Sequence, residues 1–225
     1  MDYQPAWDAS YGRRENHVFV PSDELVRYVS RHIRRRVGLN ELVDVEPGSE
    51  GAAVLDLGCG IGRHLVYGTE MGLEMHGIDL SAAAVAIAVE WLGRSIGDDA
   101  RGRVVVGDAS TLPWEDAFFA HAVSDSALDS MPFDVAEAAV AELARVVRPG
   151  GTVYLNLIAS DDGSARDHVV DTEHEHGTVQ TYFDEPRIRR LTGLAFTIEQ
   201  CHLARLEDRL GGTSHGRWHV VLRRR

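Results

Sequence analysis

The chain has 225 residues, 44% of them hydrophobic and 26% charged, and carries a formal net charge of −12. This length suits one α/β domain with a substantial core. The acidic balance argues against a protein that binds nucleic acid through a basic face, so no nucleic-acid partner is expected. No apolar run approaches the ~20 residues of a membrane-spanning helix, and residues 1–10 lack the pattern of a signal peptide. Together these features favour a cytoplasmic enzyme without a membrane span.

The cysteines and basic residues narrow the chemistry further. Every basic residue other than histidine is arginine, so no mechanism here uses a catalytic lysine. Cys59 and Cys201 have neither the spacing of a metal site nor that of a disulfide framework, and no metal is expected. Two arginine runs, residues 34–36 and 223–225, are interpreted as a solvated helix end and a frayed tail. The sequence does not define the oligomeric state.

Residues 22–37 are predicted to form the first helix. Ser22 can cap it, acidic residues favour its positive first turn, and apolar residues recur at helical spacing. Gly38 offers a stop, and the glycine-rich residues 45–51 are predicted to form a loop.

Short apolar segments then alternate with helical ones. The predicted strands are residues 53–57, 73–79, 103–106, 118–124 and 152–158. The predicted helices between them are residues 61–71, 81–92 and 135–147, the last two capped by Ser81 and Asp134. Such alternation implies a parallel sheet covered on both faces.

The C-terminal part of the sequence changes character. Residues 160–177 are polar and are predicted to form a long loop or a small lid. A helix is predicted at residues 183–191, with Asp184 near its start. Residues 194–202 and 218–223 are predicted to be two strands of an antiparallel hairpin. The expected fold class is α/β, a Rossmann-like doubly wound sheet of about seven strands, mostly parallel with an antiparallel C-terminal edge hairpin.

We expect a single domain over residues 1–225, because no repeat, low-complexity segment or linker divides the chain. Its parts are an N-terminal helical or lid segment (1–45), a cofactor-binding core (52–158), a substrate-side loop (159–182) and a C-terminal helix with edge strands (183–225).

A glycine turn follows the first strand of the predicted sheet. Asp56 lies near the end of this strand, and Gly58, Gly60 and Gly62 come after it. Without a Cβ atom, each glycine lets the backbone turn tightly and approach a ligand closely. Open α/β sheets bind ligands at this end of their strands. The full dinucleotide spacing is absent, since Arg63 stands where a third glycine or an alanine would come.

Acidic residues also end the next two strands. Asp79 can accept hydrogen bonds from both hydroxyls of a ribose, and Asp108 can meet the exocyclic amine of an adenine. Either acid alone could instead cap the following helix or turn. Three acids at three successive strand ends, with a glycine turn at the first, are a far more specific signal than any one of them.

Four segments resemble class I S-adenosylmethionine-dependent methyltransferases: residues 54–62, 76–81, 105–113 and 142–151. The resemblance covers about residues 53–158. It is closest to the small-molecule group that includes the ubiquinone and menaquinone biosynthesis methyltransferases. It implies that the cofactor is S-adenosyl-L-methionine and that its methyl group passes in line to a small-molecule acceptor.

The resemblance also assigns cofactor contacts to residues at the strand ends. Gly58, Gly60 and nearby backbone would hold the methionine part, Asp79 the ribose, and Asp108 with Ala109 the adenine. The complete set of expected cofactor residues is Asp56, Gly58, Cys59, Gly60, Gly62, Asp79, Leu80, Asp108, Ala109 and Ser124.

The acceptor side is less well defined. By the same resemblance, Ser124 and Asp125 match the position that faces the reacting methyl group. His168, His174 and His176 would overhang the cofactor and are, with Asp125, the catalytic candidates. A general base is needed only if the acceptor must lose a proton. The histidine segment could also be a metal site or a solvated polar loop.

An aromatic and polar stretch near the N-terminus includes Trp7 and Tyr11. In the family that the chain resembles, this segment often folds over the active site as a lid. The alternative is a hydrophobic strap that packs on the sheet.

Three functions remain open on the sequence alone. The leading one is an S-adenosylmethionine-dependent methyltransferase that acts on a small molecule. A nicotinamide-dependent oxidoreductase could use the same glycine turn, although Arg63 counts against it. A non-catalytic protein that binds S-adenosylmethionine could retain the fold, although the intact glycines and acids argue against a decayed site.

Overall fold

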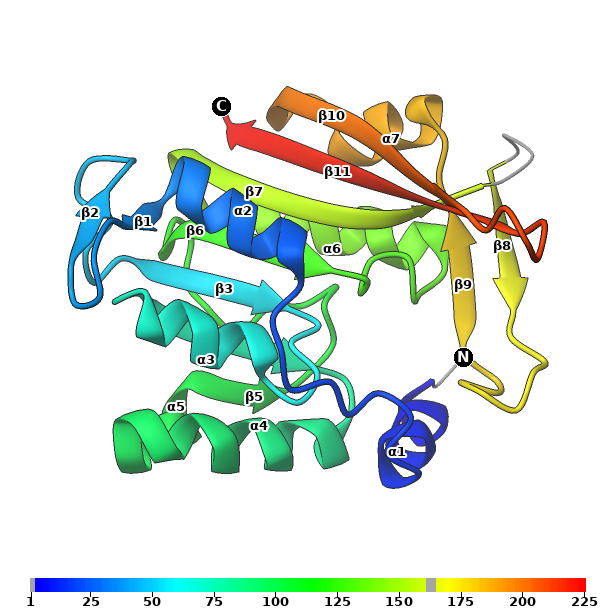
Figure 1. The fold of residues 1–225 in the computed structure, drawn as a ribbon, viewed down its shortest axis with the longest axis horizontal. Helices are drawn as coiled ribbons and strands as arrows, with labels where there is room; N and C mark the ends of the chain where they lie inside the picture. The colour runs from blue at the N-terminus through cyan, green and yellow to red at the C-terminus, as the bar shows by residue number, and fades with distance from the viewer. Residues whose placement is uncertain (1–2, 161–164) are drawn as a thin grey trace.

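A seven-stranded sheet with helices on both faces forms the centre of the molecule (Figure 1). The computed structural model describes residues 3–160 and 165–225. The strands of this sheet are β3 (Ala53–Leu57), β4 (Glu74–Asp79), β5 (Val104–Val106), β6 (Phe119–Asp125), β7 (Val147–Ala159), β10 (Phe196–Glu207) and β11 (Ser214–Arg224).

The strand order across the sheet is β10-β11-β7-β6-β3-β4-β5. Strands β3 to β7 pair in parallel, whereas β11 runs antiparallel to both β7 and β10. The chain first adds strands on one side of β3 and then places β6 on its other side. At such a reversal, the carboxyl ends of neighbouring strands flank a crevice where open α/β sheets bind ligands. The predicted fold class is confirmed, including the antiparallel hairpin at the sheet edge.

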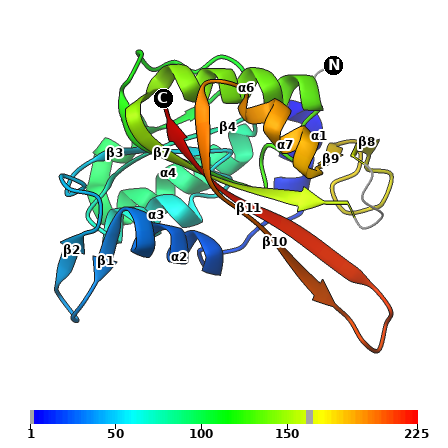
Figure 2. The ribbon, with the colours of Figure 1, turned by 90° about the horizontal axis from the view of Figure 1, so that it is seen from above.

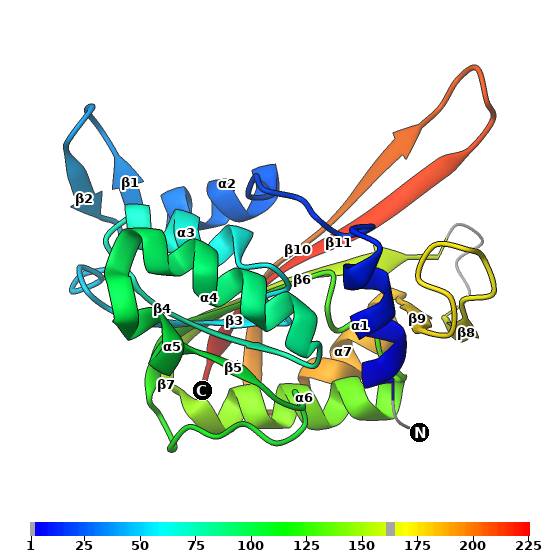
Figure 3. The same ribbon diagram turned by 90° about the horizontal axis from the view of Figure 1, so that it is seen from below.

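Helices cover both faces of the sheet and bury its apolar side chains. The helices are α2 (Asp23–His32), α3 (Arg63–Glu70), α4 (Ala82–Ile96), η1 (Gly97–Asp99), α5 (Ala100–Arg103), α6 (Phe133–Val146) and α7 (Glu185–Thr192). Helices α2, α3 and α4 share one hydrophobic cluster, which includes Leu25 and Leu65. Helices α6 and α7 belong to a second cluster, with Leu143 and Ile188. Figure 3 shows these two helical layers on opposite sides of the strands.

Side-chain caps explain where two of the helices begin. The Oγ atom of Ser81 accepts a hydrogen bond from the N–H three residues later at 3.2 Å, and the carboxylate of Asp184 does the same at 2.8 Å. Each cap satisfies a backbone donor that has no partner within its helix. Asp134, by contrast, lies inside α6, whose N-cap is Pro132, so its predicted capping role is wrong.

The helix predicted at residues 22–37 ends earlier than expected. Arg34–Arg36 form the short strand β1, which pairs with β2 (Leu42–Asp44). The Nε atom of Arg34 lies 2.8 Å from Oδ1 of Asp44, and its side chain is only 5% exposed. The run is therefore a strand and not a helix end, and its partner Asp44 draws Arg34 into the interior, whereas Arg35 and Arg36 are exposed.

The arginine run at residues 223–225 is not a frayed tail either, because its first two residues belong to β11 and the third follows that strand directly. The Nε atom of Arg223 lies 2.5 Å from Oε1 of Glu199 on the neighbouring strand. The Nε atom of Arg224 donates a hydrogen bond to the carbonyl oxygen of Ala144 at 2.6 Å. Arg34, Arg223 and Arg224 therefore have specific partners, whereas Arg35, Arg36 and Arg225 are exposed, as the interpretation of solvated ends predicted for them.

Two segments outside the main sheet lie beside the carboxyl ends of its parallel strands. One is α1 (Gln4–Gly12), and the other is a hairpin of β8 (Arg166–Val169) and β9 (Val179–Tyr182), which interrupts the predicted substrate-side loop. Residues 161–164 of that loop and residues 1–2 of the N-terminal segment lie outside the described residues. The division of the chain into four functional parts stays a prediction.

The hairpin of β10 and β11 extends beyond the body of the domain (Figure 2). Both strands are longer than predicted, because β11 pairs with β7 from Gly216 to Arg223 and with β10 from Ser214 to Arg224. No helix in the described part of the chain is both long enough and apolar enough to cross a bilayer.

Candidate active site

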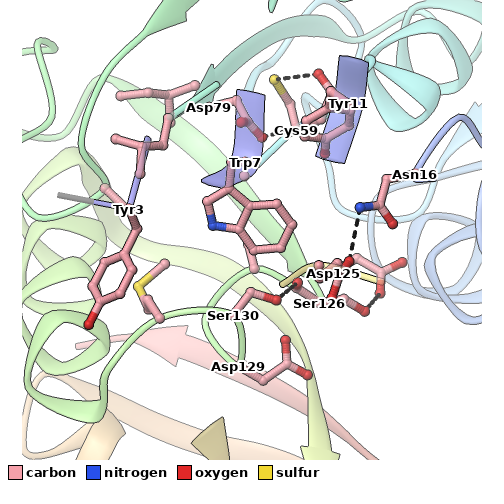
Figure 4. Close-up of a pocket in the computed structure, with 18 of the residues that line it drawn as sticks. Tyr3, Trp7, Tyr11, Asn16, Cys59, Asp79, Asp125, Ser126, Asp129 and Ser130 are labelled. Atoms are coloured by element: carbon pink, nitrogen blue, oxygen red, sulfur yellow. Dashed lines mark hydrogen bonds between the residues drawn. The ribbon is translucent and has the colours of Figure 1, made fainter. Parts of the chain in front are cut away.

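A cavity of about 640 Å³ lies where β3, β4, β5 and β6 end (Figure 4). Its lining includes residues that directly follow each of these strands, among them Gly58, Leu80, Gly107 and Ser126. Helix α1 forms another wall, and its Trp7 reaches into the space between Asp79 and Ser130 in Figure 4. The cavity is therefore bounded by the sheet on one side and by the N-terminal segment on the other.

The glycine turn after β3 forms part of the cavity wall. Gly58 and Gly60 have φ angles of +74° and +51°, in the left-handed region where a side chain is strained. A Cβ atom on Gly60 would lie 2.7 Å from the hydroxyl oxygen of Tyr11, and one on Gly58 would overlap the Cβ atom of Ala127. The backbone N–H groups of Gly58 and Cys59 donate to the carbonyl of Ile78 at 2.9 and 3.0 Å, which fixes the turn against β4.

Asp79 connects this turn to the helix that follows β4. Its Oδ2 atom accepts a hydrogen bond from the N–H of Gly60 at 2.8 Å, and its Oδ1 atom accepts one from the N–H of Ser81 at 2.9 Å. Loss of water around the carboxylate raises the pKa of Asp79 to about 6, against the opposing effect of these two hydrogen bonds. A carboxylate with this pKa is ionised at neutral pH and still has lone pairs for a ligand.

Asp108 and Ala109 line the cavity beyond β5, and Leu80 lines it beyond β4. The Oδ1 atom of Asp108 accepts hydrogen bonds from the N–H and the hydroxyl of Ser110, at 2.8 and 2.7 Å. These contacts hold an exposed carboxylate at the mouth of the cavity. Of the expected cofactor residues, those in the cavity lining are Gly58, Cys59, Gly60, Asp79, Leu80, Asp108 and Ala109.

The remaining expected cofactor residues lie outside the cavity lining. Asp56 is buried beneath it, Gly62 precedes α3, and Ser124 is fully buried in β6. A Cβ atom on Gly62 would lie 3.0 Å from that of Ala88 in α4, which gives this glycine a role in packing α3 against α4. Cofactor contact by Asp56, Gly62 and Ser124 stays a prediction.

Asp125 ends β6 and meets two residues that the sequence analysis did not assign to the site. Nε2 of His64 lies 3.4 Å and a terminal nitrogen of Arg63 lies 3.5 Å from its Oδ2 atom. Its Oδ1 atom accepts a hydrogen bond from the amide of Asn156 at 2.6 Å. Burial raises the pKa of Asp125, but His64, Arg63 and Arg217 lower it more and leave it below its ordinary value.

His64 and Arg63 are placed by the geometry of α3. Both belong to its first turn, where Cα–Cβ bonds tilt towards the helix N-terminus. Their side chains therefore reach back over the strand ends and line the cavity. Their position directly after the glycine turn was the signal in the sequence that could have identified them.

A second ion pair on the cavity wall joins the loop after β6 to β11. A terminal nitrogen of Arg217 lies 2.7 Å from Oδ2 of Asp129, and that oxygen also accepts from the N–H of Ile158 at 2.7 Å. The other terminal nitrogen of Arg217 donates to the hydroxyl of Ser126. Burial raises the pKa of Asp129, and the positive charge of Arg217 opposes that rise. These partners are far apart in the chain, so no local pattern indicated them.

The three candidate histidines lie outside the cavity lining. His168, His174 and His176 have exposed side chains, and Nδ1 of His174 lies 3.6 Å from a carboxylate oxygen of Glu15. The same segment supplies Glu175 to the lining instead. Among residues 3–160 and 165–225, no cluster of three or more His, Cys, Asp or Glu is arranged to hold a metal ion. A catalytic role for the histidines stays a prediction.

The N-terminal segment is tied across the cavity at two places. On one side, Asp8 accepts hydrogen bonds from the hydroxyl of Ser81 at 2.6 Å and from the N–H of Ala83 at 3.2 Å. On the other side, the amide of Asn16 donates to Glu175 at 2.9 Å. Asp8 thus joins α1 to the cofactor side, and Asn16, four residues after the end of α1, joins the N-terminal segment to the segment between β8 and β9.

Comparison with known proteins agrees with this architecture. Residues 54–151 match the family model of a methyltransferase domain. The glycine turn, the acidic strand ends and the strand order described above agree with this match, so the predicted resemblance to class I S-adenosylmethionine-dependent methyltransferases is confirmed. The match supports S-adenosylmethionine as the cofactor, and the nicotinamide alternative is not favoured.

Two individual relatives are similar in sequence to about half of this chain. The malonyl-[acyl-carrier protein] O-methyltransferase of Pectobacterium atrosepticum is 33% identical over 133 residues, which are 58% of this chain and 47% of that protein. Phosphoethanolamine N-methyltransferase 2 of Caenorhabditis elegans is 30% identical over 125 residues, 55% of this chain and 27% of that protein. The chain thus spans less than half the length of both relatives.

A solved structure shares the fold over the whole chain. Magnesium protoporphyrin IX methyltransferase from Synechocystis, with bound S-adenosylmethionine, superposes with a TM-score of 0.68 at 15% identity. The match covers 100% of this chain and 98% of that one. At this identity the similarity describes the fold alone.

Proposed function

We propose that this protein transfers the methyl group of S-adenosyl-L-methionine to a small-molecule acceptor bound in the cavity. The observation that carries the proposal is the continuous cavity between the glycine turn with Asp79 and the wall formed by α1. One end offers the contacts of a cofactor site, and the other offers aromatic and polar side chains for a second ligand. A volume of about 640 Å³ falls within the range of about 300–1,000 Å³ that is usual for ligand sites.

The residues present fit this cofactor. The positive φ angles of Gly58 and Gly60, and the absence of Cβ atoms there, let a ligand approach the backbone of the turn. In this proposal Asp79 holds the ribose hydroxyls, and Asp108 with Ala109 faces the adenine, because all three line the cavity at successive strand ends. In this arrangement the carboxylate of Asp79 accepts hydrogen bonds from the ligand as well as from the turn.

The protein's part in the reaction is alignment and exclusion of water. When bound, S-adenosylmethionine supplies an electrophilic methyl group on a positively charged sulfur. Trp7 and Tyr11 of α1 wall the cavity and limit the access of water. Burial raises the pKa of the Tyr11 phenol, so this side chain stays protonated and can donate a hydrogen bond inside the site. Asp125 is the candidate that receives a proton if the acceptor must lose one.

The proposed acceptor is a small molecule, and the proposal does not specify which of its atoms receives the methyl group. One relative bears the name of an O-methyltransferase and the other that of an N-methyltransferase, so relatives alone do not choose between oxygen and nitrogen. The cytoplasmic location expected from the sequence stays a prediction, as does the closing of the N-terminal segment over the site.

Isothermal titration calorimetry with purified protein tests the proposal. We expect S-adenosylmethionine and S-adenosylhomocysteine to bind in a 1:1 ratio and NAD not to bind. Asp79→Ala should abolish measurable binding without unfolding the protein. A folded wild-type protein that binds neither ligand, or that prefers NAD, would refute the proposed function. Binding without methylation of any acceptor in a broad panel would instead favour a non-catalytic role.

A further inference from the structure

The lining of the cavity contains more negative than positive groups. Among the described residues that line it, six carry a carboxylate, two carry a guanidinium group and one carries an imidazole. The six acids are Asp79, Asp108, Asp125, Asp129, Asp134 and Glu175. Asp79 and Asp108 belong to the cofactor side, so four carboxylates remain on the side where the methyl acceptor binds.

The two arginines of the cavity each face one of these four carboxylates. A terminal nitrogen of Arg217 lies 2.7 Å from Oδ2 of Asp129, and one of Arg63 lies 3.5 Å from Oδ2 of Asp125. A guanidinium group beside a carboxylate attracts a second anion only weakly, because the pair has no net charge. The arginines therefore do not make the cavity a site for an anionic methyl acceptor.

The other two carboxylates have no arginine beside them in the described part of the chain. Glu175 accepts a hydrogen bond from the neutral amide of Asn16 at 2.9 Å, and the exposed imidazole of His174 lies 3.5 Å from the same oxygen. Asp134 is exposed in the first turn of α6. These two acids leave the methyl-acceptor side with an excess of negative charge.

Two buried carboxylate oxygens on this side also lack a hydrogen-bond donor. The side chains of Asp125 and Asp129 are only 2% and 3% exposed. Within residues 3–160 and 165–225, nothing donates a hydrogen bond to Oδ2 of Asp125 or to Oδ1 of Asp129. A buried polar atom without a partner is costly, so such an atom in a binding cavity points to a ligand that completes it. Because both atoms are hydrogen-bond acceptors, that ligand must supply N–H or O–H donors.

The opposite wall of the cavity is aromatic. Trp7 and Tyr3, from the N-terminal segment, both line the cavity. In Figure 4, Trp7 lies on one side of the space and Asp129 on the other. The face of an indole ring attracts a cation, and tryptophan does so more strongly than the other aromatic residues. A carboxylate on one wall and an indole on the other suit a nitrogen that carries both hydrogens and positive charge.

We propose that the methyl acceptor is an amine, whose nitrogen binds between Trp7 and Asp129 and receives the methyl group. This inference rests on the proposed function and names the class of its second substrate. The carboxylate of Asp129 binds the ammonium form and takes one proton from it, and burial favours this transfer because it raises the pKa of Asp129.

The methyl transfer then conserves the charge in the cavity. The lone pair of the neutral amine forms the new N–C bond while the C–S bond breaks and its electron pair stays on sulfur. The positive charge passes from sulfur to nitrogen, and the product is a methylated ammonium ion. Carboxylates beside the nitrogen stabilise the charge that develops there. A carboxylate as methyl acceptor would instead add an anion to a cavity that is already acidic.

The test compares ligands that have similar carbon skeletons and differ in their polar group. Three sets serve as probes: benzylamine, benzyl alcohol and benzoate; hexylamine, hexanol and hexanoate; and tryptamine, tryptophol and indoleacetate. Calorimetry measures their binding to the wild-type protein saturated with S-adenosylhomocysteine. We expect the best amine to bind at least about tenfold more tightly than its matched alcohol and carboxylate. With S-adenosylmethionine, mass spectrometry should detect N-methylated products and no methyl ether or ester.

Variants locate the origin of this preference. Asp129→Asn keeps the shape of the side chain without its charge and should weaken binding of the best amine about 30-fold. Its affinities for the matched alcohol and for S-adenosylhomocysteine should stay within about twofold, which a general structural defect would not allow. Glu175→Gln should weaken amine binding about threefold. Glu173→Gln, at an exposed acid of the same segment outside the cavity lining, is the control and should change nothing.

Tighter binding or methylation of the alcohols or carboxylates would overturn the inference, as would a panel in which no amine binds. Equal losses for amine and alcohol in Asp129→Asn would also contradict it. Failure of the wild-type protein to bind S-adenosylhomocysteine would refute the proposed function instead, so the two failures are distinct. If far-UV circular dichroism shows that Asp129→Asn does not fold, the wild-type comparison and Glu175→Gln decide the question.

Discussion

The two sides of the cavity are assembled in different ways. On the cofactor side, the glycine turn, Asp79 and Asp108 follow successive strands within one continuous part of the chain. On the acceptor side, α1, the loop after β6, the segment before β9 and the distant strand β11 meet only in the folded molecule. The first side follows from local backbone requirements and the second from tertiary contacts, so mutations should affect the two sides differently.

The largest effect is expected for Asp79→Asn. The amide cannot accept two hydrogen bonds from a ribose as a carboxylate does, and we expect the dissociation constant of S-adenosylhomocysteine to rise about 100-fold. Asp98→Asn, at an exposed acid in η1, is the control and should leave binding unchanged. Comparable affinities for Asp79→Asn and the wild type would show that the cofactor side does not depend on this strand end.

A pair of glycine substitutions separates backbone strain from steric overlap. Gly58 and Gly48 have similar φ angles of +74° and +77°, but only at Gly58 would a Cβ atom meet a neighbour, Ala127. We expect Gly48→Ala to lower the free energy of unfolding by about 1 kcal/mol and Gly58→Ala by about 3 kcal/mol. Urea denaturation measures both values. Equal losses would mean that the turn can relax around a side chain.

The pH dependence of product binding tests the environment of Asp79. Because the pKa of this carboxylate is raised to about 6, its protonation competes with ribose binding below that pH. The affinity for S-adenosylhomocysteine should therefore fall about tenfold between about pH 7 and about pH 5. Calorimetry of Asp79→Asn should show a much smaller pH effect, and an unchanged slope would assign the effect to another group.

The same raised pKa has the opposite sign for folding. A carboxyl group with a higher pKa in the folded state contributes stability at low pH, and this contribution is lost as the pH rises through about 6. Without ligand at neutral pH, Asp79→Asn should therefore be more stable than the wild type by about 1 kcal/mol, since partial exposure reduces the effect. A lower melting temperature for this variant would contradict the sign.

The smallest effect is expected on the acceptor side, at the contact between Asn16 and Glu175. Asn16→Ala removes one partly buried hydrogen bond that ties the N-terminal segment across the cavity. We expect S-adenosylhomocysteine to dissociate about threefold faster, as stopped-flow tryptophan fluorescence can report. Asn40→Ala, at an exposed position away from the cavity, should leave the rate unchanged. A change of more than about tenfold would mean that this contact controls access more strongly than one hydrogen bond allows.

The sequence predicted the parts of the molecule in which local chemistry decides the structure. The alternation of strands and helices, the cap at Ser81 and the hairpin at the sheet edge agree with the structure. The helix predicted at residues 22–37 was too long because Arg34 has a partner in β2. Helical spacing of apolar residues carries no information about such a contact.

The candidate site divides in the same way. Asp79 and Asp108 could be chosen from the sequence because each follows a predicted strand. The ion pair of Asp129 with Arg217 joins residues 88 positions apart, and neither has a local pattern that marks it. His168, His174 and His176 were chosen as catalytic candidates because of their residue type, but their side chains are exposed. A residue type suited to catalysis indicates little without knowledge of the surface it lines.

The position of β11 has a consequence for the order in which the molecule can form. This strand follows every other strand of the sheet in the chain, yet it lies between β7 and β10. Until β11 is available, β10 has no neighbour in the sheet, and Asp129 lacks the guanidinium that pairs with it. The acceptor side of the cavity therefore depends on the last strand of the sheet to be synthesised, whereas the glycine turn, Asp79 and Asp108 all precede that strand in the chain.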